Sequence, residues 1–292
     1  MNAQSVLDRL RTVAKRDGRE FQATLLLYAQ ERLLARLAGS AYREHFALKG
    51  GVYLYSRYRA TARPTQDMDF AGRNTSNDPQ ALLGIVRDIA GVSLHDGVTY
   101  NLETLTAAPI AEATEYAGVR VRLEARIGQA RLRVTLDIGF GDAITPAPHL
   151  QTFPTLLTTE AITVLTVTLE TVIAEKFQAM VALGAQNTRL KDFYDLHRIA
   201  LTEPLSATAL RIALERTFER RETSFTTALE CLAQDFAADS SRQRLWEAYL
   251  KRTRLEAPGS FADVMSAIQD LLEPIVSGAA EGEWRPQLRR WN

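Results

Sequence analysis

Residues 48–70 read L-K-G-G-V-Y-L-Y-S-R-Y-R-A-T-A-R-P-T-Q-D-M-D-F. At the end of this stretch Asp67 and Asp69 alternate with Met68 and Phe70, as in a strand whose two faces differ. The two carboxylates would then point to the same side, about 7 Å apart, where they repel each other. A bound cation would remove that cost, because Mg²⁺ takes carboxylate oxygens together with substrate phosphates.

A glycine pair, Gly50 and Gly51, lies near the start of the same stretch, directly after an apolar run. Glycine leaves backbone N–H groups uncovered by a side chain, as phosphate binding requires. A lone Asp-x-Asp pair is more often an exposed edge strand than a site. Together with the upstream glycine pair, it indicates nucleotide chemistry.

The composition is that of an ordinary globular protein. The chain has 292 residues, of which 46% are apolar and 24% charged, enough for about two domains. The formal net charge is zero, so RNA binding would need a local basic patch. The single cysteine, Cys231, excludes an internal disulfide, and the four scattered histidines indicate no metal site. The chain shows neither a signal-peptide pattern nor a membrane-spanning run, so we expect a cytoplasmic protein.

The clearest periodic signal lies between residues 118 and 139. Two runs of alternating apolar and polar residues flank Gly128 and Gln129, which predicts a β-hairpin with one buried face. Asp137 lies on the polar face and adds a third carboxylate to the pair described above. Three carboxylates on one sheet face can hold two Mg²⁺ ions. Asp137 is also the candidate base for an attacking hydroxyl.

The remaining patterns predict an α/β (α+β) fold, with a small mixed sheet flanked by helices, followed by an α-helical C-terminal domain. We expect the first domain at residues 1–150 and the second at 151–292, with the proline-rich segment 141–154 as a linker. Helical spacing covers residues 3–45, 168–183, 191–201, 206–220, 225–236, 240–254 and 260–277.

Two charged clusters lie in the predicted helices of the C-terminal half. Lys176 falls on or beside an apolar stripe, where it either snorkels to water or contacts triphosphate oxygens. Lys191, Asp192 and Asp195 form the pattern K-D-x-x-D, which alone is no more than an ordinary set of charges at a helix start.

Arginines are dense in two places, and both flank the predicted site. Because most surface arginines are only solvated, these are candidates for contact with an RNA backbone or a triphosphate, not evidence of it. They are Arg57, Arg59, Arg63 and Arg73 in the first place, and Arg120, Arg122, Arg126, Arg131 and Arg133 in the second.

In this order, L-K-G-G…R-P-T-Q-D-M-D-F, L-D-I-G-F-G-D, E-K and R-L-K-D-F-Y-D-L resemble the AbiEii/AbiGii-type nucleotidyltransferase toxins. That group includes the MenT toxins of mycobacteria and belongs to the DNA-polymerase-β-like nucleotidyltransferase superfamily. The resemblance covers about residues 45–200. It implies a nucleotidyltransferase fold and Mg²⁺-dependent transfer of NMP from an NTP. It also implies a toxin that modifies the 3′ acceptor end of tRNA, blocks aminoacylation and translation, and is encoded beside a cognate antitoxin.

The resemblance also predicts the site residues, of which Asp195 is the expected essential acid of the K-D-x-x-D motif. The predicted metal ligands are Asp67, Asp69 and Asp137. The predicted nucleotide-binding residues are Lys49, Gly50, Gly51, Thr65, Lys176, Lys191 and Asp192. The predicted catalytic residues are Asp67, Asp69, Asp137, Lys176 and Asp195.

Two other functions stay open at the level of sequence. One is nucleotidyl transfer to a small molecule, as in aminoglycoside-modifying enzymes, or to a protein hydroxyl. The other is a non-catalytic module that holds nucleotide or RNA, although such a module has no need of clustered carboxylates. We expect neither DNA nor a membrane as a partner.

Overall fold

The computed structural model describes residues 2–110, 118–158, 160–225, 228, 232, 236–237, 239–256 and 258–292. The chain divides into two compact units. The first comprises Met1–Asp142 and Pro148–Val167, and the second comprises Ala143–Ala147 and Thr168–Asn292. The two-domain division expected after residue 150 stays a prediction.

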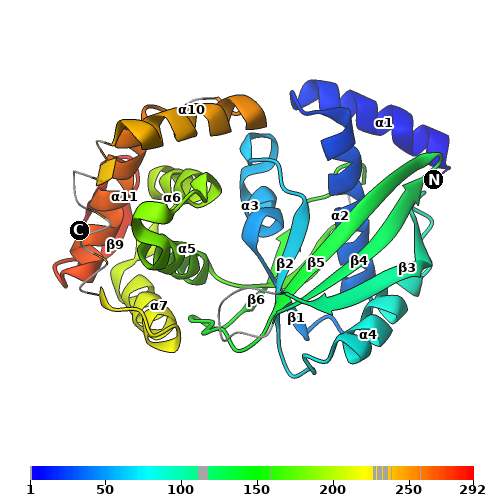
Figure 1. The fold of residues 1–292 in the computed structure, drawn as a ribbon. Coiled ribbons are helices and arrows are strands. Elements are labelled where there is room, and N and C mark those ends of the chain that lie inside the picture. The colour runs from blue at the N-terminus through cyan, green and yellow to red at the C-terminus, as the bar shows by residue number, and fades with distance from the viewer. Residues whose placement is uncertain are drawn as a thin grey trace. The chain divides into compact units, whose positions relative to one another are not determined.

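The first unit is built on a seven-stranded mixed sheet with the order β3-β4-β5-β2-β1-β7-β6 (Figure 1). Strand β2 runs parallel to β5, and β1 runs parallel to β7, whereas the other neighbouring pairs are antiparallel. The strands are β1 (Phe46–Lys49), β2 (Asp67–Gly72), β3 (Thr99–Pro109), β4 (Gly118–Ile127), β5 (Ala130–Gly139), β6 (His149–Phe153) and β7 (Ile162–Thr166). The expected mixed sheet is confirmed.

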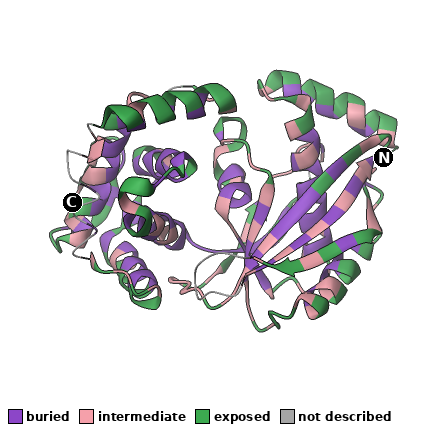
Figure 2. Ribbon diagram, viewed as in Figure 1, coloured by how far each residue is buried: buried purple, intermediate pink, exposed green. Residues whose placement is uncertain are grey.

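Strands β4 and β5 form the predicted hairpin. Gly128 takes a φ of 58°, the left-handed conformation that a two-residue hairpin turn requires. Buried residues alternate with less buried ones along the whole of β4 (Figure 2). Ile127 faces Ala130, and each step outward pairs the next two residues, as far as Gly118 and Gly139.

Helices cover the apolar face of this sheet. The helical region expected at residues 3–45 consists of two helices, because Gly18 takes a φ of 63° between them. Side chains from α2, α4, β1, β2 and β5 meet around a cavity of about 20 Å³, whose apolar lining offers a water molecule no hydrogen-bond partner. The helices of this unit are α1 (Ala3–Arg16), α2 (Phe21–Ala38), α3 (Gly50–Tyr58), the short 3₁₀ turn η1 (Arg59–Thr61) and α4 (Pro79–Gly91).

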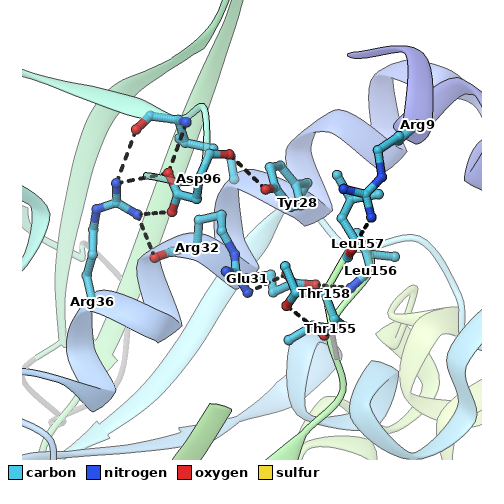
Figure 3. A network of polar contacts seen from close by, with 12 residues as sticks. Arg9, Tyr28, Glu31, Arg32, Arg36, Asp96, Thr155, Leu156, Leu157 and Thr158 are labelled. Carbon is cyan, nitrogen blue, oxygen red and sulfur yellow. Dashed lines mark hydrogen bonds and ion pairs between the residues drawn. The ribbon is translucent and has the colours of Figure 1, made fainter. Parts of the chain in front are cut away.

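A buried polar network anchors α2 within the unit (Figure 3). Arg36 donates to Asp96 Oδ2 at 2.7 Å and to Oδ1 at 3.3 Å. One turn earlier, Glu31 accepts a hydrogen bond from Arg32 Nη2 at 2.6 Å and another from the Leu156 N–H at 2.7 Å. These charges are buried but paired, as burial demands, and they serve to hold loops against the helix.

The linker expected at residues 141–154 is wrong in part, because β6 occupies His149–Phe153 and pairs with β7. Strand β6 lies at the edge of the sheet, and most of its residues are exposed or half-buried, so it lacks the alternation that marks a half-buried strand. Strand β3, at the opposite edge, has a register shift between Asn101 and Thr106 and was not predicted for the same reason.

The second unit is mainly helical, as expected. Each described α-helix begins and ends within one residue of its predicted bounds, whereas the short 3₁₀ helix η2 (Gly184–Gln186) was not predicted. The helix expected at 225–236 lies largely outside the described residues, and Cys231 lies outside them entirely. The helices are α5 (Leu169–Leu183), η2 (Gly184–Gln186), α6 (Leu190–Thr202), α7 (Ala207–Arg220), α10 (Ser240–Thr253) and α11 (Phe261–Val276). A small sheet of β8 (Leu205–Ser206), β9 (Glu283–Arg285) and β10 (Arg290–Trp291) was not expected.

None of the helices in the described part of the chain has the length and apolar character needed to span a membrane.

Candidate functional site

The glycine pair and the β2 carboxylates are neighbours in the fold. Gly50 begins α3 directly after β1 and takes a φ of 66°. A Cβ built on Gly50 would lie 1.9 Å from Asp69 Oδ2, so this carboxylate rests on the glycine backbone. A Cβ on Gly51 would lie 2.5 Å from Thr65 Oγ1. Only glycine at both positions permits this approach, and only the fold brings these two parts of the chain together.

The N-terminus of α3 has the properties of a phosphate site. The first N–H groups of a helix have no partner within it, and the helix dipole places partial positive charge at this end. No acidic side chain lies in the first turn of α3, and Gly50 and Gly51 leave its N–H groups open. Anions bind at such helix ends. Asp69 therefore lies beside a position suited to phosphate.

Three predicted carboxylates share the polar face of the sheet. Asp67 and Asp69 are half-buried and alternate with the buried Met68 and Phe70. On the neighbouring parallel strand β5, Asp137 aligns with Asp69. The fold thus gathers on one face the acidic side chains that the sequence carries on two separate strands.

The third of these carboxylates is engaged by a cation of the protein itself. Arg120 donates from Nε to Asp137 Oδ1 and from Nη2 to Asp137 Oδ2, both at 2.6 Å. The exposed fractions are 34% for the arginine side chain and 18% for the aspartate, so this fork is only partly screened by water. No group of three or more His, Cys, Asp or Glu side chains able to hold a metal ion occurs in the described parts of the chain. The role of Asp137 as a metal ligand stays a prediction.

A divalent cation still fits the remaining donors. Mg²⁺ is commonly bound through one or two carboxylates, with substrate phosphates and water completing its shell. Asp67 and Asp69 supply two carboxylates on one face, and Asp69 lies against the glycine where a phosphate is expected. The pair therefore suits a metal that arrives with a nucleoside triphosphate, and a closed protein cage is not required.

Lys49, the last residue of β1, forms an ion pair that sequence reasoning missed. Its Nζ lies 2.9 Å from Asp142 Oδ2, and both side chains are largely buried. Lys49 also pairs in register with Asp69 across β1 and β2. Asp142 follows the strand that carries Asp137, and its place in L-D-I-G-F-G-D was the available signal.

In the second unit, the structure gathers three of the four charged residues predicted there. Lys176 Nζ on α5 lies 2.7 Å from Asp192 Oδ1 and 2.8 Å from Asp195 Oδ2 on α6. The exposed fraction is 10% for the lysine side chain and at most 4% for the two aspartates. The two aspartates stand one turn apart on α6 and therefore face the same lysine. Lys191, in contrast, is exposed and is not part of this cluster.

The electrostatics of this cluster keep Asp192 ionised. Burial by itself raises the pKa of Asp192, but the opposing charges of Lys176 and Arg189 outweigh it, and the pKa is lowered overall. Arg189 Nε lies 2.9 Å from Asp192 Oδ2. Arg189 was not among the predicted site residues, although it stands three residues before Asp192, where a helical contact is expected.

Arg120 was predicted as a candidate contact for RNA or triphosphate, but its pairing with Asp137 was missed, although the sequence contains the signal for it. A two-residue turn at Gly128 and Gln129 determines the register of the hairpin, and counting outward from that turn places Arg120 opposite Asp137. Charged residues of opposite sign that face each other across two strands attract.

Comparison with known proteins gives a family and a fold. The family described as nucleotidyl transferase AbiEii toxin, type IV TA system, matches the chain over residues 32–273. No curated protein that was compared matches the chain. The crystal structure of JHP933 from Helicobacter pylori is similar with a TM-score of 0.51 at 17% identity, over 89% of this chain and 94% of that one. A candidate nucleotidyltransferase from H. pylori gives a TM-score of 0.49 at 18% identity, over 86% and 92% of the two chains. JHP933 shares the fold of this chain.

Proposed function

The chain belongs to the AbiEii nucleotidyltransferase toxin family of type IV toxin–antitoxin systems, and from this we propose that it transfers NMP from an NTP to the 3′ acceptor end of tRNA. The reaction depends on Mg²⁺ and takes place in the cytoplasm. It blocks aminoacylation and therefore translation. The family itself implies a nucleotidyltransferase with an NTP as substrate and an antitoxin as partner.

The observation that carries this proposal is the contact between Asp69 and Gly50. It places a carboxylate of the predicted metal pair beside the N-terminus of α3, where phosphate oxygens find open N–H groups. Metal-assisted transfer of a nucleotide requires such an adjacency, because the metal and the N–H groups bind oxygens of one triphosphate.

The reaction exchanges one bond to phosphorus for another. The 3′ oxygen of the acceptor attacks the α-phosphorus, the bond to the bridging oxygen breaks, and pyrophosphate leaves. The N–H groups of Gly50 and Gly51 hold the phosphates that depart. Asp67 and Asp69 would hold Mg²⁺, which would supply positive charge to the phosphate oxygens.

Asp137 is the base that accepts the proton of the attacking hydroxyl. Arg120 occupies one lone pair on each of its oxygens, and each oxygen keeps another with which to accept a proton. The fork also holds the carboxylate in one orientation. Arg120 is thus a positioning residue for the proton acceptor.

The charged residues of the second unit are assigned by the family resemblance. That resemblance assigns nucleotide binding to Lys176, Lys191 and Asp192 and makes Asp195 an essential acid. In the first unit it assigns nucleotide binding to Lys49 and Thr65. Lys176 and the two aspartates form a single buried cluster joined by ion pairs.

Labelling tests the proposal directly. Purified protein is incubated with deacylated tRNA, Mg²⁺ and each of the four α-labelled NTPs in turn. We expect label on tRNA from at least one NTP, loss of labelling with EDTA, and loss with Asp69→Asn. The matched control is Asp88→Asn, an exposed residue of α4 whose contact with Tyr42 an amide oxygen can preserve.

If a small molecule or a protein is labelled while tRNA stays unlabelled with all four NTPs, the acceptor is not tRNA, but the chain is still a nucleotidyltransferase. Mass spectrometry identifies such an acceptor by the gain of one NMP. Absence of any NTP turnover with Mg²⁺ would refute the proposal as a whole.

A further inference from the structure

A groove lies on the polar face of the first unit's sheet, over strands β3, β4 and β5. Its volume is about 630 Å³. Its polar lining consists of Thr104, Thr106, Arg122, Glu124, Arg131 and Arg133. The function proposed above does not use this groove.

The groove is strongly basic in a chain whose formal net charge is zero. Glu124, the one acidic residue in its lining, accepts a hydrogen bond from Arg126 Nε at 2.6 Å and is thereby neutralised. The arginines Arg122, Arg131 and Arg133 make no ion pair or side-chain hydrogen bond with any residue that the structure describes. Arg131 and Arg133 are exposed. Three guanidinium groups are thus available to a ligand.

Folding accounts for only part of this arrangement, namely for Arg133, which faces Glu124 across the ladder. Arg131 stands directly opposite Arg126 in the β4–β5 ladder, and like charges that face each other across two strands are destabilising. Arg122 faces Thr135, which carries no charge to balance it. A bound polyanion would offset the repulsion.

The groove continues the face that carries the carboxylates. Arg122 is two residues from Arg120 on β4, and Arg120 is bonded to Asp137. Along β5, Arg133 and Arg131 share the face of Asp137, about 13 Å and about 20 Å away, at about 3.3 Å per residue. A single-stranded nucleic acid whose end reaches the carboxylates can therefore place its neighbouring phosphates over these arginines.

We propose that this groove binds the sugar–phosphate backbone of the RNA acceptor, a few nucleotides from the reacting 3′ end. This inference rests on the proposed function and names how that function holds its RNA. Guanidinium groups pair with phosphate oxygens through two parallel hydrogen bonds, and the exposed hydroxyl of Thr106 can bond to phosphate or to a ribose 2′-OH. Phosphate contacts do not read bases, so the groove positions many tRNAs alike.

The test compares two double variants of the full chain. Arg131→Gln with Arg133→Gln removes two exposed charges from the groove. Arg43→Gln with Arg87→Gln removes two exposed charges elsewhere in the same unit, before β1 and on α4. Equal urea midpoints for all three proteins establish that folding is unaffected. If the groove double variant unfolds, Arg133→Gln alone takes its place, with Arg87→Gln as its control.

Binding is measured by fluorescence anisotropy with a labelled RNA hairpin that has a single-stranded 3′ end. We expect the groove double variant to bind at least about tenfold more weakly. The slope of log K against log salt should fall by about 1.4, since each contact with a single-stranded phosphate contributes about 0.7. The KM for tRNA should rise while the KM for NTP stays as in the wild type. The control double variant should resemble the wild type.

Wild-type RNA affinity and salt slope in the folded groove variant would overturn the inference, as would failure of the wild type to bind the RNA. If the folded groove variant binds RNA like the wild type but no longer binds the antitoxin, the groove would instead be assigned to an acidic protein segment. RNA binding that depends on the groove, without label transfer to any RNA, would instead refute the proposed function and leave the groove assignment standing.

Discussion

Asp69 Oδ2 occupies the space beside Gly50 that the Cβ of any other residue would need, since the two positions would be 1.9 Å apart. Two requirements meet at Gly50. Its φ of 66° favours glycine, and its neighbour leaves no room for a side chain. The carboxylate and the open start of α3 are in contact only because position 50 is glycine.

Gly50→Ala should therefore abolish labelling and lower the free energy of unfolding by about 1–3 kcal/mol, through backbone strain and displacement of Asp69. The matched control is Gly84→Ala within α4, where an added Cβ would meet nothing within 4 Å. That change should raise stability by about 0.5–1 kcal/mol and leave activity unchanged. Urea denaturation and tRNA labelling measure both variants. A fully active Gly50→Ala protein would contradict the role given to this contact.

Substitution of Asp137 and substitution of Asp67 should affect different kinetic properties. Asp137→Asn should lower kcat by about 10²-fold or more, the usual contribution of a general base. Because Arg120 engages both oxygens of Asp137, the Mg²⁺ concentration that gives half-maximal rate should not change. Asp67→Asn should raise that concentration. Titration of activity with Mg²⁺ separates the two roles, and a shifted Mg²⁺ requirement in Asp137→Asn would make Asp137 a metal ligand.

Lys176→Met should destabilise the second unit by about 3–5 kcal/mol, because it leaves Asp192 and Asp195 buried without their shared cation. Lys191→Met is the matched control. Since Lys191 is exposed, its loss should change stability by no more than about 0.5 kcal/mol. Urea denaturation gives both values. If Lys176→Met keeps wild-type stability while losing activity, the lysine acts on the substrate alone.

Glu31 should make the first unit more stable in mild acid. Burial is the main cause that raises the pKa of Glu31 from 4.5 to about 7, against the lowering effect of Arg32. The folded chain thus holds this proton more tightly than the unfolded chain. The resulting stabilisation is fully present below about pH 4.5 and is lost as the pH rises through 7, a change of about 3 kcal/mol. Hydrogen exchange in α2 between pH 4 and 8 measures it, and Glu31→Gln should flatten the profile.

His197 should make the second unit less stable in acid. Burial is the main cause that lowers the pKa of His197 from 6.5 to about 4, with Arg289 and Arg198 adding to it. The stability that the neutral ring contributes is present above about pH 6.5 and is lost as the pH falls through 4, again about 3 kcal/mol. Hydrogen exchange in α6 reports it. An unchanged acid sensitivity in His197→Gln would contradict this assignment.

Much of the fold could be predicted because its signals are local. The alternation along β4 and β5 reflects a sheet with one covered face, and helical spacing placed each described α-helix of the second unit within one residue. The edge strands β3 and β6 escaped prediction, because exposed residues such as Leu150 carry no alternation. The small sheet of β8, β9 and β10 escaped for a similar reason, since its strands have only two or three residues.

The sequence by itself determined which chemistry the chain carries and on which side of each element it lies. Asp67 and Asp69 share a face because strand side chains alternate, and Arg120 faces Asp137 because a two-residue turn sets the register. Only the tertiary structure decided which distant groups meet: Asp69 with Gly50, Lys49 with Asp142, and Lys176 with Asp192 and Asp195. Alternation and turn geometry act over a few residues, whereas these contacts depend on how whole strands and helices pack, which no local pattern records.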